Sequence, residues 1–97
     1  MPSKLDENLK EKSIENMTKN MVALRTMLHL SQAELATLIG VGRQTLVAIE
    51  TRKRKMTWSM FLSLLFVFSQ NKETCSLLEI FGIYTSEMKK IYSDINT

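Results

Sequence analysis

Apolar residues recur every three or four positions along most of the chain, and this spacing predicts helices rather than strands. The first apolar stripe is long enough for a helix of about four turns. It consists of Ile14, Met17, Met21, Leu24 and Leu28. Ser13 is the predicted N-cap of this helix. Residues 1–12 before it form a charged arm, whose sequence fits both a short helix and a disordered segment.

Residues 30–50, LSQAELATLIGVGRQTLVAIE, predict two short helices joined by a tight turn. Ser31 and Glu34 have the spacing of a capping box, in which each side chain bonds the other residue's backbone N–H. Gly40 ends the first helix, because glycine adopts the left-handed conformation of a helix stop without steric conflict. Gly42 is the predicted N-cap of the second helix. This helix covers residues 43–50, with Leu46 and Ile49 facing inward and with Arg43, Gln44, Thr45 and Ala48 exposed.

A fourth predicted helix covers residues 58–70, with Thr57 as its N-cap, and follows a polar, basic loop at residues 51–55. It is apolar nearly all round, which is typical of a helix that is buried on two sides. One face consists of Trp58, Phe61, Leu64, Leu65 and Phe68. Because Leu62 and Phe66 lie on another side, we expect the C-terminal part of the chain to cover them.

Residues 56–71 carry no charge, so a membrane-spanning helix has to be considered. These sixteen residues fall short of the roughly 20 that span a bilayer, and hydroxyl and amide side chains interrupt them. We therefore expect a soluble protein with no membrane partner.

The C-terminal residues predict two further helices. Asn71 is the predicted cap of a helix that ends near Phe81, with Gly82 as its stop, and Thr85 or Ser86 begins the last helix. The apolar residues of these helices have two compatible interpretations. They close the core of the monomer, or part of their surface pairs two copies of the chain.

Three glycines and one proline leave few turn residues for a sheet, so we predict an all-α fold. The expected architecture has four to five core helices with one or two extra C-terminal helices. The 97 residues are long enough for one domain with a small core. We divide this domain into the charged arm at 1–12, a helical core at 13–70 and C-terminal helices at 71–97.

Composition limits the chemistry of the protein. Cys75 is the single cysteine and has no internal disulfide partner, which fits a reducing, cytoplasmic setting. The polar start of the chain has no signal-peptide pattern. His29 is the single histidine, so no Cys/His cluster is present to bind zinc. We expect no metal and no cofactor, and we find no nucleophile, phosphate-loop or paired-carboxylate pattern that indicates an enzyme.

The net charge of +3 is concentrated in one segment. Residues 43–55 carry five positive side chains and one negative, whereas residues 1–42 balance and residues 72–97 carry a net charge of −1. A charged run is often only a solvated surface. Here it adjoins the exposed side of the helix at 43–50, which indicates a phosphate-binding surface.

The segment 30–50 combines small and apolar residues that a helix-turn-helix needs for steric reasons. They are Ala36, Gly40, Leu46 and Ile49. Around them stand Gln32 and Leu35 in the first helix, Val41 in the turn and Glu50 at the end of the second helix. With them, residues 17–69 resemble the helix-turn-helix domain of the phage repressor and Cro family, also called the xenobiotic-response-element family. The resemblance implies a lambda-repressor-like bundle. It also implies a partly buried ion pair between Arg25 and Glu50.

The resemblance assigns DNA-binding roles to individual positions. Gln32 matches a residue that anchors a phosphate at the start of a helix. The residues at positions that reach base edges are Arg43, Gln44, Thr45 and Ala48. Arginine suits guanine, glutamine suits adenine, and the methyl groups of threonine and alanine suit thymine. The residues at positions that clamp the DNA backbone, or extend this clamp, are Thr51, Arg52, Lys53, Arg54 and Lys55.

The chain departs from the family pattern at two places near the predicted DNA surface. Gly42 stands where many members have a serine or threonine cap, and Thr51-Arg52 replaces a frequent Asn-Gly pair. We expect a sequence-specific DNA-binding regulator, a repressor, that acts as a homodimer on half-sites about 34 Å apart. The alternative is a protein-interaction module of the same fold, either an antitoxin with a toxin partner or an adaptor.

Overall fold

The computed structural model describes residues 7–94, and these residues form six α-helices and no strand. In chain order the helices are α1 (Glu7–Met27), α2 (Gln32–Ile39), α3 (Arg43–Glu50), α4 (Trp58–Ser69), α5 (Lys72–Ile80) and α6 (Ser86–Ser93). The all-helical prediction is confirmed. The predicted caps at Thr57 and Asn71 are also confirmed, and the last helix is capped by Thr85, one of the two residues predicted. Each of these side chains accepts a hydrogen bond from the first turn of its helix.

The first helix begins earlier than predicted. It starts at Glu7, so Ser13 lies within α1, and the prediction of Ser13 as its N-cap is wrong. Residues 1–6 of the predicted arm lie outside the described residues. Ser13 is buried because α6 packs over it, and its hydroxyl donates to Met88 Sδ at 3.4 Å. The charged segment 7–12 therefore continues the helix that carries the apolar stripe.

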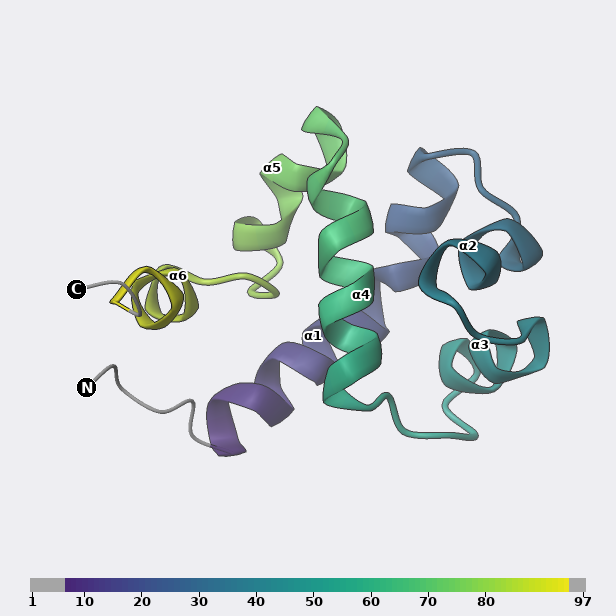
Figure 1. Cartoon of the computed structure of the whole chain (residues 1–97), viewed down its shortest axis with the longest axis horizontal. Helices are drawn as coiled ribbons and strands as arrows, with labels where there is room; N and C mark the ends of the chain where they lie inside the picture. Colours follow the sequence, from purple (N-terminus) through teal and green to yellow (C-terminus); the bar gives the residue numbers. More distant parts are fainter. Residues whose placement is uncertain (1–6, 95–97) are drawn as a thin grey trace.

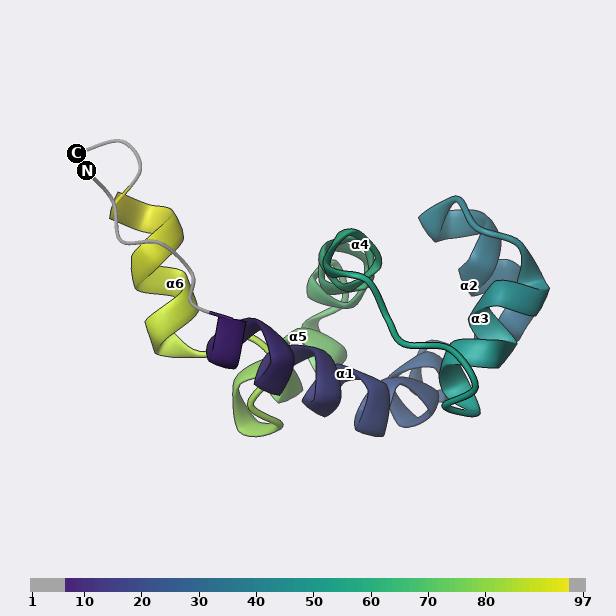
Figure 2. The ribbon, with the colours of Figure 1, turned by 90° about the horizontal axis from the view of Figure 1, so that it is seen from below.

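The helices are arranged around α4 (Figure 1). In that view α2 and α3 lie on one side of α4, α5 and α6 lie on the other, and α1 crosses behind it. Helix α1 packs against α3 and α4, α2 packs against α3 and α4, and α5 packs against α4. Figure 2 shows that α1 runs through the middle part of the molecule, with α6 near its N-terminal end and α3 near its C-terminal end.

One continuous core joins all six helices and two of the connecting segments. Its fully buried members include Met17, Met21, Leu24, Leu35, Leu46, Ile49, Phe61, Leu64, Phe68, Leu78, Ile83 and Met88. At its edge the rings of Trp58 and Phe61 stack with their centroids 4.6 Å apart. The ammonium group of Lys10 lies 5.5 Å from the centre of the Trp58 ring. The N-terminal half of α1 is thereby fastened to the start of α4.

The connection after α5 requires a glycine. Gly82 has φ +69°, and a Cβ built on it would lie 2.8 Å from Asn16 Nδ2. That same amide group donates a hydrogen bond to the carbonyl of Gly82 at 3.0 Å. The close approach ties the turn before α6 to α1. Gly82 thus stops α5, as predicted, and also makes room for a contact with the first helix.

The expectation that the C-terminal helices cover Leu62 and Phe66 is wrong. The side chains of Leu62 and Phe66 are 37% and 67% exposed, and with Leu38 they line an apolar groove between α2 and α4. Helix α5 lies on the same side of α4 as α1 (Figure 2). A short turn fixes it there, because the Thr74 hydroxyl donates to the carbonyl of Phe68 at 2.6 Å. Within residues 7–94, no helix has the length and apolarity needed to cross a membrane.

Candidate nucleic-acid interface

The turn between α2 and α3 forms by local hydrogen bonds that the sequence specifies. Glu34 N–H donates to Ser31 Oγ at 3.0 Å, and Ser31 N–H donates to Glu34 Oε1 at 2.8 Å, which completes the predicted capping box. Hydrogen bonding of the Glu34 carboxyl with the backbone N–H of Ser31, and to a smaller extent with its hydroxyl, lowers the pKa of that carboxyl. Gly40 adopts φ +76° at the end of α2, as predicted. Two capped ends therefore define the short helix α2.

Helix α3 presents a polar face to solvent. Leu46 and Ile49 are fully buried, while Arg43 and Gln44 are exposed. This helix starts at Gly42 without a side-chain cap. Its outer face and the following loop line a shallow groove formed by Arg43, Gln44, Val47, Ala48, Thr51 and Lys53.

Four residues of α3 make up the reading face, defined as Arg43, Gln44, Thr45 and Ala48. Thr45 and Ala48 are partly exposed. Val47 also lines the groove, although the resemblance assigned it no role. Its position four residues after Arg43 is the signal that could have placed it on the same side of the helix.

Arg25 and Glu50 form a bidentate ion pair that joins α1 to the end of α3. Arg25 Nε donates to Glu50 Oε2 at 2.8 Å, and Arg25 Nη2 donates to Oε1 at 3.2 Å. The two side chains are 12% and 4% exposed. Arg25 Nη1 also donates to the carbonyl of Leu30 at 3.0 Å. The pair therefore holds three segments together: α1, the turn before α2, and α3.

Gln32 extends this network to the first residue of α3. Its Nε2 donates to Glu50 Oε1 at 2.9 Å, and its Oε1 accepts a hydrogen bond from Arg43 Nη2 at 3.3 Å. Arg43 is thus oriented by a chain of hydrogen bonds that begins at Arg25. The resemblance assigned Gln32 a phosphate contact but gave no indication of these two bonds.

The basic loop, residues 51–55, is fastened to α3 by its backbone. The N–H groups of Lys53 and Arg54 both donate to the carbonyl of Ala48, at 2.8 and 3.1 Å. Thr51 Oγ1 donates to the carbonyl of Val47 at 2.8 Å. Arg52 has φ +62°, in the left-handed region that favours glycine. The loop therefore keeps a glycine-like bend even though arginine stands there.

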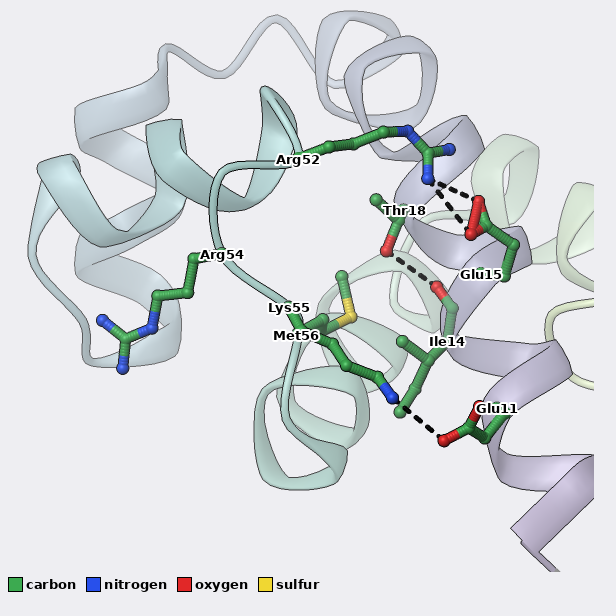
Figure 3. Close-up of a pocket in the computed structure, with 8 residues that line it drawn as sticks. All are labelled: Glu11, Ile14, Glu15, Thr18, Arg52, Arg54, Lys55 and Met56. Carbon is green, nitrogen blue, oxygen red and sulfur yellow. Dashed lines mark hydrogen bonds and ion pairs between the residues drawn. The ribbon is translucent and has the colours of Figure 1, made fainter.

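The cations of the basic loop point in different directions (Figure 3). Arg52 Nη1 lies 2.6 Å from Glu15 Oε1, and Lys55 Nζ lies 2.9 Å from Glu11 Oε1. Figure 3 shows that the guanidinium of Arg54 points away from these carboxylates. Lys53, in contrast, lines the groove beside the reading face of α3.

The structure therefore brings some of the predicted DNA-binding residues together and separates others. Lys53 adjoins the reading face, whereas Arg52 and Lys55 face α1. Within residues 7–94, the side chains of Lys53 and Arg54 make no hydrogen bond or ion pair. The sequence reasoning missed Glu11 and Glu15. Their spacing of four residues puts them on one face of α1, but that spacing does not reveal which loop they meet.

Comparison with known proteins gives one finding for this surface. Residues 21–57 match a family model whose description is helix-turn-helix. The matched segment begins within α1, contains α2 and α3, and ends at the residue before α4. No curated protein and no solved structure matches the chain.

Proposed function

Because residues 21–57 belong to the phage repressor and Cro-like helix-turn-helix family of DNA-binding regulators, we propose that α3 enters the DNA major groove and reads sequence there. The observation that carries this proposal is the exposed reading face of α3. It lies on a helix whose two ends are held, Glu50 by Arg25 and Arg43 by Gln32. A fixed helix can present base-contacting side chains in one orientation.

The reading face has the chemistry for base recognition. Arg43 can donate two hydrogen bonds to a guanine edge, and Gln44 can bond adenine in the same bidentate manner. The methyl groups of Thr45 and Ala48 suit contact with thymine. Because Gln32 bonds Arg43, we propose that this arginine reaches a base rather than only a phosphate. We also propose that Gln32, the first residue of α2, contacts a phosphate at the N-terminus of that helix.

Phosphate contacts are proposed for the basic loop. Lys53 and Arg54 are exposed, and their cations have no protein partner within the described residues. Arg52 and Lys55 would first have to leave Glu15 and Glu11. Exposed ion pairs of this kind contribute about 0–1 kcal/mol, so a DNA phosphate can displace them. Thr51 completes the proposed clamp.

We further propose that the protein acts as a homodimer and a repressor. An eight-residue recognition helix contacts few base pairs, so two copies on a palindromic site would supply the specificity of a regulator. The two recognition helices would enter successive major grooves about 34 Å apart. Occupying these grooves excludes other proteins from the same DNA, and repression follows directly from that exclusion.

Selection of bound sites from random double-stranded DNA tests the proposal. We expect an enriched, roughly palindromic sequence, followed by anisotropy titrations in which the enriched duplex binds at least about 1,000-fold more tightly than random sequence. The logarithm of the affinity should fall steeply with the logarithm of the salt concentration. A shallow salt dependence and no enriched sequence would overturn the proposal.

The apolar groove lined by Leu38, Leu62 and Phe66 supports one alternative, a protein-interaction module such as an antitoxin or adaptor. In that case a second protein covers the groove. The Phe66→Gln variant distinguishes the two functions. Loss of a bound protein with retained operator binding would favour the alternative, and retained operator binding by a protein that binds no partner would favour the regulator.

A further inference from the structure

Two cations of the basic loop are held by carboxylates of the first helix. Glu11 and Glu15 lie one turn apart on α1, and each pairs with one loop residue, Lys55 and Arg52 respectively (Figure 3). The two pairs border a hollow between α1 and the loop. Both cations are therefore already paired with carboxylate oxygens of the same chain.

The backbone of Arg52 indicates that its cation has a role beyond stability. A non-glycine residue at φ +62° is strained, and glycine would be relaxed there. The side chains of Arg52 and Glu15 are 53% and 56% exposed, so solvent weakens their attraction. An exposed ion pair does not offset backbone strain by much. Arginine at this position therefore favours binding to an external anion.

We propose that Glu11 and Glu15 are internal competitors of DNA phosphate for Lys55 and Arg52, and that they set the affinity of the protein for DNA of any sequence. This proposal rests on the DNA-binding function proposed above. Phosphate contacts are independent of sequence and supply nearly all non-specific binding. Holding two of the loop cations on α1 leaves Lys53 and Arg54 as the free phosphate ligands of the loop. Glu11 and Glu15 thus act as positioning residues for the basic loop.

The experiment measures binding of the full chain to a random-sequence duplex by fluorescence anisotropy at several salt concentrations. We expect the Glu11→Gln/Glu15→Gln variant to bind about 3- to 10-fold more tightly near physiological salt. The slope of log affinity against log salt should become steeper by up to about 2, because each freed cation neutralises one more phosphate. Thermal unfolding verifies that the variant is folded.

The control has the same change in net charge at other sites. Glu7 is exposed on α1 and lies near Lys10, and Glu73 is exposed on α5. The Glu7→Gln/Glu73→Gln variant should leave the salt slope unchanged, because it frees no cation of the loop. A second test combines substitutions. In an Arg52→Gln background, Glu15→Gln should have no further effect on the slope, since its partner is gone.

The outcomes separate this inference from the proposed function. The proposed competition is wrong if the Glu11→Gln/Glu15→Gln variant has the same salt slope as its control. It is also wrong if Glu15→Gln still steepens the slope in the Arg52→Gln background. In either case the proposed operator binding is unaffected. If neither the wild-type protein nor any variant binds a duplex, both proposals fail. A steeper slope confined to the variants of Glu11 and Glu15 supports the inference.

Discussion

The Glu50 carboxylate is the most heavily bonded acidic group of the helix-turn-helix. It accepts hydrogen bonds from Arg25 and Gln32, and its side chain is 4% exposed. A carboxylate removed from water depends on such donors, because burying a charge without a partner is unfavourable. Arg25 is therefore the residue on which the burial of Glu50 chiefly depends.

Replacing Arg25 should destabilise the protein. The Arg25→Met variant leaves Glu50 buried with only the Gln32 amide, so we expect the free energy of unfolding to fall by about 3 kcal/mol. Urea unfolding measures this change. The control is Lys53→Met, at an exposed cation, which should change the same quantity by less than about 0.5 kcal/mol. Equal stability of the two variants would show that the pair does not brace α3.

Two residues of the groove on α3 should affect DNA binding differently. Arg43→Ala should weaken operator binding by about 1–3 kcal/mol relative to random-sequence DNA, because a base contact is lost. Lys53→Gln should weaken binding to operator DNA and to random-sequence DNA alike. It should also reduce the slope of log affinity against log salt by about 1, because a phosphate contact is lost. Anisotropy titrations with both duplexes measure the difference. If Arg43→Ala weakens both duplexes equally, Arg43 contacts only a phosphate.

At the scale of elements, α4 has one buried face and one uncovered face. Phe61 is fully buried in the core, whereas Phe66 is 67% exposed in the apolar groove. The two residues have the same side chain on the same helix. They therefore form a matched pair for testing which face of α4 carries the core.

Truncating these two phenylalanines should have unequal effects on stability. We expect Phe61→Ala to lower the free energy of unfolding by about 3–5 kcal/mol, since it removes a core ring and leaves a cavity. Phe66→Ala should lower it by less than about 1 kcal/mol. Both are measured by denaturant unfolding at low protein concentration. A large effect of Phe66→Ala would mean that the groove is covered in solution.

Helix ends could be predicted from the sequence where the signal is local. The capping box of Ser31 and Glu34 is complete within four residues, and Gly40 acts through its own backbone. The start of α1 at Glu7 could not be predicted in this way. Residues 7–12 are polar apart from Leu9, and they are held in a helix that contacts α4 through Lys10 and α6 through Ser13.

At the scale of the whole molecule, the homodimer proposal predicts how many protomers bind one DNA duplex. Sedimentation velocity of the protein with its selected palindromic duplex should give two protomers per DNA. A duplex with one half-site should bind one protomer, and more weakly, because the second copy contributes no contacts. One protomer on the full palindrome would contradict the homodimer proposal.

The candidate site could be predicted in its parts but not in its connections. Helical spacing alone predicts that Arg43 and Gln44 lie on an exposed face, and both are exposed. The direction of the loop cations depends instead on how α1 lies against residues 51–55, which is a tertiary property. The exposure of Phe66 depends likewise on which side of α4 receives α5. Sequence periodicity cannot distinguish two apolar sides of one helix.

The contacts of α1 with Gly82 and Met88 have a consequence for folding kinetics. They join residues 66 and 75 positions apart, whereas α2 and α3 are neighbours in the chain. Closing the longer loop has the larger entropic penalty, so these contacts should form after the rate-limiting step. We expect Met88→Ala mainly to accelerate unfolding and Leu46→Ala mainly to slow refolding, as measured by stopped-flow kinetics. The helix-turn-helix would then fold first, and the C-terminal helices would govern how long it stays folded.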